Sequence, residues 1–191
     1  MQRIPLGDRW WVEVGAAPAD LCPPEPARLE ALWALHPTEH TVLVMYGKPV
    51  PIPRFQRAYG RDYRFSNQTS PAEPIPALLE PFLAWARTVD PRMNGLLLNW
   101  YDAAHGHRIG PHRDSQSGLV EGAPILTMSF GATRCFRLKR YRGTERVDVE
   151  VGHGSAVVIP WETNEAWTHE VPHRASDKGR RISVTVRAFA E

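Results

Sequence analysis

The sequence predicts a mostly β fold with helices in its N-terminal part, an α+β chain with a jelly-roll core. After residue 95 the chain consists of short apolar segments bounded by Gly, Pro, Asp or Asn, the pattern of many short strands. Before residue 95, two segments instead repeat apolar residues at helical spacing. Many short strands at regular intervals are typical of a sandwich or barrel, and a double-sheet jelly roll suits their number.

Length and composition place the chain among soluble globular proteins. It has 191 residues, enough for one well-buried domain, with 42% apolar and 23% charged residues. No apolar run approaches the roughly 18 residues that cross a bilayer, and the N-terminus lacks the apolar region of a secretory signal. Cys22 and Cys135 stand apart and indicate no disulfide framework. We therefore expect a cytoplasmic monomer with no membrane segment.

The N-terminal part divides into three segments. Residues 1–40 form an extension with one expected helix at 26–36, where Leu29, Leu32 and Trp33 follow a spacing of three to four. Residues 41–75 are rich in Pro, Arg and aromatic residues and are expected to form loops. Residues 76–94 carry the second helical pattern. Pro81 would interrupt that helix, which therefore either kinks there or begins later than its pattern indicates.

Residues 95–191 are expected to form the jelly-roll core of a single domain covering the whole chain. Each predicted strand is a short run of apolar and β-branched residues between turn residues. The predicted strands are 95–101, 125–130, 134–139, 147–151, 155–159, 166–171 and 181–189.

The last predicted strand separates two kinds of side chain. Its apolar residues alternate with Arg181, Ser183, Thr185 and Arg187, which share the opposite face. Two guanidinium groups near the ends of one strand face suit a small dicarboxylate held at both ends. The alternative is that this face is the solvated outer surface of an edge strand. Asn99 and Tyr101 share one face of the strand at 95–101, and both can hydrogen-bond a carboxylate.

The stretch GPHRDSQSG, residues 110–118, places His112 two residues before Asp114. In an extended segment both side chains can reach one point, and a second histidine would complete the facial triad of non-haem Fe(II) oxygenases. The alternative is an ordinary polar turn. His153 lies in a predicted turn, while His169 lies within a predicted strand and His173 follows it. Context favours His169, although spacing alone does not decide between His169 and His173.

The order of these segments resembles the AlkB family of Fe(II)/2-oxoglutarate-dependent dioxygenases. The resemblance covers about residues 46–189 and runs through PRFQRAYGRDYRFSN, NWY, HRD, SFG, WTHEVP and RISVTVR. It implies a double-stranded β-helix, or jelly roll, with catalytic iron held by His112, Asp114 and His169. It further implies that 2-oxoglutarate is bound by five residues of two strands, namely Asn99, Tyr101, Arg181, Ser183 and Arg187.

The chemistry implied by the resemblance is oxidative demethylation of N-alkylated bases, of the 1-methyladenine or 3-methylcytosine type, in DNA or RNA. Fe(II), 2-oxoglutarate and O₂ are the implied cofactors. The base would have to be single-stranded or flipped out of a duplex. One alternative is the same oxygenase chemistry on a modified tRNA base, a protein or a small metabolite. Another is a non-catalytic jelly-roll binding module whose site is structural or filled by zinc.

Several residues are candidates for substrate contacts. Tyr63 and Phe65 could form one stacking wall for a flipped base, with the His112 ring opposite. Arg54 belongs to a basic segment suited to phosphate contacts, and Tyr46 lies at a predicted hairpin tip, where it could wedge into a base stack. Nucleic-acid repair members of the family usually carry a second acidic residue after HxD. Here Ser115 and Gln116 follow, and because Gln116 can both accept and donate, the base preference stays open.

Overall fold

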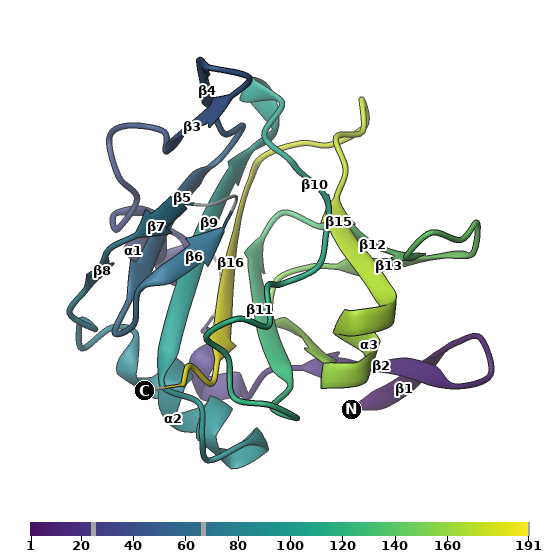
Figure 1. Cartoon of the computed structure of the whole chain (residues 1–191). Helices are drawn as coiled ribbons and strands as arrows, with labels where there is room; N and C mark the ends of the chain where they lie inside the picture. Colours follow the sequence, from purple (N-terminus) through teal and green to yellow (C-terminus); the bar gives the residue numbers. More distant parts are fainter. Residues whose placement is uncertain (24–25, 66–67, 191) are drawn as a thin grey trace.

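Two β-sheets packed face to face form the core of the computed structural model, which describes residues 1–23, 26–65 and 68–190 (Figure 1). The larger, eight-stranded sheet has the order β1 (Gln2–Leu6), β2 (Trp10–Ala16), β14 (Ser155–Ile159), β11 (Ile125–Gly131), β16 (Arg180–Arg187), β9 (Gly95–Asp102), β5 (Phe55–Tyr59) and β8 (Ala72–Glu73). The smaller, four-stranded sheet has the order β10 (Ile109–His112), β15 (Trp167–Val171), β12 (Arg134–Arg140) and β13 (Arg146–Val151). The predicted jelly-roll core is confirmed.

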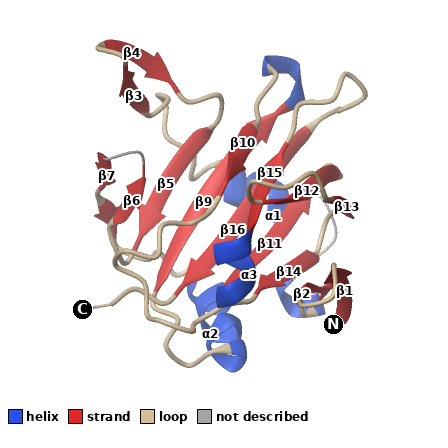
Figure 2. Cartoon of the chain, turned by 45° about the vertical axis from the view of Figure 1, so that its right-hand side comes forward, coloured by secondary structure: helices blue, strands red, loops and turns tan. Residues whose placement is uncertain are grey.

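Helices lie around this sheet pair (Figure 2). The α-helices are α1 (Ala27–Trp33), α2 (Glu80–Val89) and α3 (Trp161–Ala166), and the short 3-10 turns are η1 (Ala19–Leu21) and η2 (Ala103–His105). The helix predicted at 26–36 is confirmed as α1. α2 begins at Glu80, later than its apolar pattern, because Pro81 fits the first turn of a helix, where the missing N–H has no partner to lose. No helix in the described part of the chain is long and apolar enough to cross a membrane.

Apolar side chains fill two layers, one on each face of the larger sheet. The first layer packs α1 and α2 against the sheet through residues such as Leu32, Phe82 and Trp100. Trp100 also donates from its indole nitrogen to the Leu32 carbonyl oxygen at 2.9 Å, which ties β9 to the end of α1. The second layer lies between the two sheets and includes Phe136 and Trp167. The site described below opens within this second layer.

β16 is a central strand, so the alternative of an edge strand with a solvated face is wrong. It pairs with β11 on one side and with β9 on the other, and Arg181–Arg187 is buried throughout. Ile182 and its apolar neighbours pack against the helices. The polar face of the strand therefore points into the space between the sheets. Burial on both faces explains why the polar residues here cannot be ordinary surface residues.

Two segments differ from their expected structure. Residues 1–40 contain, besides α1, the hairpin β1–β2, which extends the larger sheet by pairing with β14. Residues 41–75 are not simply loops, because β5 pairs with β9 in the larger sheet. The Pro- and Arg-rich composition hid this strand, whose partner lies about 40 residues further along the chain. Besides β5 and β8, the segment contains β3 (Val42–Met45), β4 (Lys48–Pro51), β6 (Tyr63–Phe65) and β7 (Gln68–Ser70).

β3 and β4 form the hairpin that the sequence predicts around residues 45–49. Met45 pairs with Lys48, which leaves Tyr46 and Gly47 as a two-residue turn. Both have positive φ, 51° and 74°, as a type I′ turn requires. The Tyr46 side chain is 98% exposed, so the hairpin presents an aromatic ring at its tip.

Candidate metal centre

His112, Asp114 and His169 meet at one point between the two sheets. The antiparallel pairing of β10 with β15 places His112 directly opposite His169, and Asp114 follows two residues after β10 ends. Asp114 Oδ1 lies 3.8 Å from His112 Nε2 and 3.9 Å from His169 Nε2. Ligand atoms that each lie about 2.1 Å from one ion are at most about 4.2 Å apart, so these distances suit a shared metal. The three side chains form the only convergent set of this kind in the described part of the chain.

The structure resolves which histidine joins the pair. His153 lies in the turn that leads from β13 to β14, where its Nδ1 accepts a hydrogen bond from the Gly131 N–H at 3.3 Å. His173 lies beyond the end of β15 and is exposed. Neither His153 nor His173 belongs to the set of ligand atoms that converges around Asp114 in the described structure, whereas His169 does. The choice of His169 over its two rivals therefore follows from strand pairing.

Asp114 is held by two residues from distant elements. Arg187 donates from Nε to Asp114 Oδ2 at 2.6 Å, which leaves Oδ1 facing the two histidines. The Asn164 side chain in α3 makes two hydrogen bonds to the backbone of Asp114. Its Oδ1 accepts from the Asp114 N–H at 2.9 Å, and its Nδ2 donates to the Asp114 carbonyl at 3.0 Å. Sequence analysis missed Asn164, because nothing in its local pattern marks a contact 50 residues away.

The surroundings keep the three groups in the protonation states that a metal needs. Burial, and after it the nearby His112, lower the pKa of His169 to about 3. Burial also lowers the pKa of His112. For Asp114, burial alone would raise the pKa, but Arg187 and then the two histidines outweigh it and hold the pKa below its ordinary value. Neutral imidazoles and an ionised carboxylate are the forms that bind metal at neutral pH.

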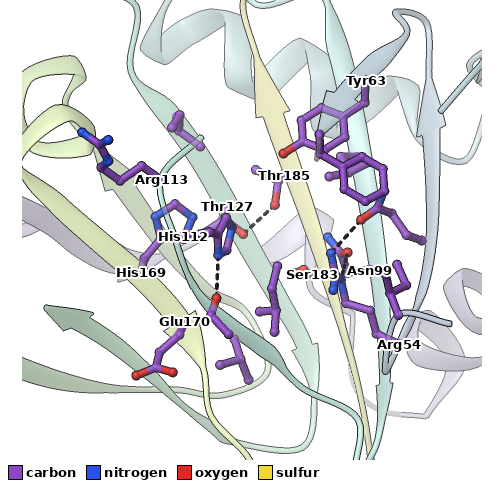
Figure 3. A pocket seen from close by; sticks show the side chains of 18 of the residues that line it. Arg54, Tyr63, Asn99, His112, Arg113, Thr127, His169, Glu170, Ser183 and Thr185 are labelled. Carbon is purple, nitrogen blue, oxygen red and sulfur yellow. Dashed lines mark hydrogen bonds between the residues drawn. The ribbon is translucent and has the colours of Figure 1, made fainter. Parts of the chain in front are cut away.

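The two histidines of the triad border a cavity of about 290 Å³ between the sheets. Figure 3 shows His112 and His169 on one side of it and Asn99, Ser183 and Arg54 on the other. All five residues that the resemblance assigns to 2-oxoglutarate line this cavity, namely Asn99, Tyr101, Arg181, Ser183 and Arg187. Thr127 and Thr185 lie between the two groups and share a hydrogen bond of 3.0 Å. The predicted polar faces of β9 and β16 are thus brought together in one space.

Buried nitrogen atoms without partners show what this cavity fits. Arg181 donates from Nη2 to Ser129 Oγ at 2.8 Å, but its Nε and Nη1 are buried and have no partner among the described residues. Arg187 Nη1 is likewise buried and unpartnered. A buried cation without an anion is costly, so an anionic ligand is the natural complement. Arg187 already has Asp114 as its anion, but its Nη1 remains available beside Arg181, and two guanidinium groups on one strand face suit the two carboxylates of 2-oxoglutarate.

The predicted substrate residues divide between the cavity and the surface. Tyr63 and Phe65 line the cavity with rings 5.6 Å apart and nearly parallel, and the Tyr63 hydroxyl lies 3.4 Å from Asp114 Oδ1. Tyr46 lies outside it, at the hairpin tip. Ser115 lines the cavity, whereas the neighbouring Gln116 is not among the described residues that do.

Arg54 differs from its expected position on a phosphate-binding surface. It is only 7% exposed and lies within the cavity, where it donates to Asn99 Oδ1 at 2.8 Å and to Gln56 Oε1 at 2.9 Å. Burial lowers the pKa of its guanidinium. Arg54 therefore positions Asn99 and adds a third buried cation to the cavity. Sequence analysis could not detect this, because β5 itself was not predicted.

Fold and site together define a class of protein. A jelly roll that presents two histidines and one aspartate as a convergent set beside a cavity is the arrangement of mononuclear non-haem iron oxygenases. Residues 29–187 match the family model described as the 2OG-Fe(II) oxygenase superfamily. The chain belongs to this superfamily and, within it, to the AlkB family. The expected cofactors, Fe(II), 2-oxoglutarate and O₂, are those of this superfamily.

Known relatives agree with this placement. Over 155 residues, or 75% of this chain, the sequence is 35% identical to the DNA oxidative demethylase ALKBH2 of Bos taurus, of which 55% is covered, and to that of Homo sapiens, of which 59% is covered. It is 28% identical, over 72% of the chain and 50% of the relative, to the alpha-ketoglutarate-dependent dioxygenase alkB homolog 3 of Rattus norvegicus. The chain thus spans about half the length of these curated relatives.

A solved structure is similar in fold. The structure titled "The structure of OsALKBH1" superposes with a TM-score of 0.51 at 14% identity, covering 78% of this chain and 80% of that one. At this identity the likeness concerns the fold alone, and it supports the jelly-roll architecture.

Replacing His169 by Ala should abolish tight metal binding. Changes to residues that merely support metal ligands cost about 10–100-fold in affinity, so loss of a ligand should cost at least about 100-fold. Titration of the apoprotein with Mn(II), followed by the electron paramagnetic resonance signal of free Mn(II), measures this. His153→Ala and His173→Ala are matched controls and should bind Mn(II) like the wild type. Equal losses in a control and in His169→Ala would contradict the assignment.

Replacing Arg181 by Met should weaken 2-oxoglutarate binding by roughly 10–100-fold, because a hydrogen-bonded charge contributes about 1.5–3 kcal/mol. Met keeps most of the volume and removes the cation. Calorimetric titration of the Mn(II)-loaded protein measures the affinity. Arg174→Met, which removes an exposed guanidinium paired with Glu150, is the matched control. Unchanged affinity in Arg181→Met would remove Arg181 from the co-substrate site.

Proposed function

We propose that this chain is an Fe(II)/2-oxoglutarate-dependent enzyme that oxidatively removes methyl groups from N-alkylated bases of nucleic acid. The expected bases are of the 1-methyladenine or 3-methylcytosine type. The observation that carries the proposal is one cavity lined by the two histidines of the triad, by arginines with unpartnered nitrogens and by an aromatic wall. The relatives named DNA oxidative demethylase favour DNA as the polymer.

Residues for metal binding and residues for co-substrate binding come from different sheets. Iron, 2-oxoglutarate and O₂ together supply the oxidation, in which the co-substrate becomes succinate and CO₂ while the N-methyl carbon is hydroxylated and leaves as formaldehyde. His112 and His169 of the smaller sheet, together with Asp114 just after β10, would hold the metal. Arg181 and Arg187 face it from the larger sheet and neutralise the co-substrate's carboxylates. Packing between the sheets excludes bulk water from these charges, which strengthens their interactions.

The substrate base has to leave its stack to reach this site. His169 and Asp114 are buried between the sheets, and a base paired within a duplex cannot approach them. Tyr63 and Phe65 offer ring faces inside the cavity, and the partly exposed His112 ring lines it as well. Stacking on such faces contributes about 1–3 kcal/mol per base and tolerates different bases.

Neutral groups would read the edge of the base. Ser115 and Gln116 follow HRD, where repair members of the family usually carry an acid, and the Gln56 amide nitrogen is buried in the cavity with no partner among the described residues. Glu170 also borders the cavity, but its carboxylate lies 3.8 Å from Arg137 Nη1, its partner across β12 and β15. Because this acid is missing, a second candidate function is the same oxygenase chemistry on a modified tRNA base, a protein or a small metabolite. The monomeric state and the cytoplasmic location stay predictions.

Methylated DNA and RNA oligonucleotides, single- and double-stranded, should lose one methyl group per turnover when incubated with protein, Fe(II), ascorbate and 2-oxoglutarate. Mass spectrometry of the oligonucleotide detects the loss, and succinate should form in equal amount. Asp114→Ala, which removes a ligand, is the inactive control. If the wild type converts 2-oxoglutarate to succinate but no methylated base is changed, the second candidate replaces the first.

Replacing Tyr46 by Ala should reduce demethylation of double-stranded substrate by about 10-fold and leave single-stranded substrate nearly unaffected. An aromatic side chain wedged into a base stack helps to separate the strands, a step that single strands do not need. Tyr141→Ala removes another exposed tyrosine, on the turn between β12 and β13, and serves as control. A loss of equal size on both substrates would argue against a wedge.

A further inference from the structure

A second cavity, of about 560 Å³, lies behind the root of the β3–β4 hairpin and outside the metal centre. It is bordered by the end of α1, by residues 51–53 after the hairpin, by β5 and by the segment around η2. We call it the histidine groove, after the six rings that line it: Trp33, His36, His40, Phe55, His105 and His107. None of these residues takes part in the site described above.

The rings of the histidine groove are arranged around Phe55. The His36 and His40 rings lie nearly parallel to it, with centroids 4.9 and 4.2 Å away. His107 meets both Phe55 and His40 edge-on, at 5.5 and 5.2 Å. His36, His40 and Phe55 are half-buried, and the His105 side chain is 70% exposed. A set of rings that reaches solvent in this way offers faces and edges on which a planar ligand can stack.

Polar groups around the histidine groove favour an anion. Asp102 is the acid that borders it, and this carboxylate is already engaged by the Ala104 N–H at 2.9 Å and by His105 Nδ1 at 3.3 Å. The backbone of Arg108 lies beside the groove, since its backbone N–H donates to the Pro53 carbonyl at 2.8 Å. The Arg180 guanidinium lies 4.8 Å over the Trp33 ring and is also paired with the Glu30 carboxylate. Imidazole and guanidinium donors next to ring faces are the combination that binds phosphate and base together.

The histidine groove and the metal centre lie on opposite sides of one short segment. Ile52 borders both cavities. His40 donates from Nδ1 to the Arg54 carbonyl at 2.9 Å, while the Arg54 side chain lies in the metal-centre cavity. A strand with one nucleotide in the metal centre therefore has this groove within reach across the hairpin root. A second metal is not indicated, because among the described residues the histidines of the groove form no convergent ligand set.

We propose that the histidine groove binds an unpaired nucleotide of the substrate strand, close to the nucleotide that enters the metal centre. The rings stack against the base, and the histidine and arginine donors contact the phosphate. This inference rests on the proposed function, because it requires a nucleic-acid substrate. It adds a binding site that holds the strand without taking part in the oxidation.

The double substitution His36→Ala, His105→Ala tests the groove. His36 Nδ1 contacts only the neighbouring Pro37 carbonyl in the described structure, and His105 is exposed, so the fold should tolerate both changes. Fluorescence anisotropy with a methylated single strand of about 12 nucleotides should show roughly 10-fold weaker binding. Demethylation of a methylated mononucleotide, which has no neighbouring nucleotide to place in the groove, should stay unchanged. His153→Ala, a histidine substitution in the turn between β13 and β14, is the matched control.

Photo-crosslinking of the wild type gives a second, independent test. Single strands carrying 5-iododeoxyuridine at successive positions beside the methylated base should crosslink to peptides that contain residues 33–40 or 102–107. Absence of demethylation by the wild type would overturn the proposed function itself. Normal demethylation together with wild-type strand affinity in the double variant, or with crosslinks confined to other peptides, would overturn the groove alone.

Discussion

The buried contact between Arg187 and Asp114 is the constraint on which the rest of the site depends. It joins the last strand of the larger sheet to the segment that follows β10 in the smaller one, and both side chains are almost completely buried, at 5% and 1% exposure. Removing either partner would leave a buried charge uncompensated, which typically costs 3–5 kcal/mol. Because Oδ2 of the carboxylate is occupied by Arg187, Oδ1 is directed toward the histidines. The same contact therefore holds the two sheets together and fixes the orientation of the Asp114 carboxylate.

The cavity beside this contact has an excess of positive charge. Arg54, Arg181 and Arg187 border it, and Asp114 is the carboxylate that partners one of them. Burial lowers the pKa of Arg54 and of Arg181, which shows that their environment disfavours the unpaired cation. Binding of a dianion relieves this cost, so the site is prepared for its co-substrate. Residues 46–55 connect this cavity to the surface. They run from the exposed hairpin tip to Arg54 inside the cavity, and the histidine groove lies beside them.

Local sequence pattern predicted most of the C-terminal half and little of the N-terminal half. The strands at 155–159 and 181–189 emerged from alternation and turn residues, and β14 and β16 lie there. β5 and the hairpin β1–β2 were not predicted, because their stability comes from pairing with β9 and β14 rather than from their own composition. Arg54 was misplaced on the surface for the same reason. Asn164 escaped attention because its importance lies in one contact with Asp114.

By itself, the sequence predicted the jelly-roll class, the HRD pair as candidate metal ligands and the separation of polar from apolar side chains along β9 and β16. These are consequences of short-range periodicity and of residue chemistry, which are complete within a few residues. Only the tertiary structure decided that the polar face of β16 is buried, that His169 rather than His173 faces His112, and that Ser115 rather than Gln116 borders the cavity. Each of these depends on the register and packing of strands far apart in the chain, where a shift of one residue would turn every side chain to the other face.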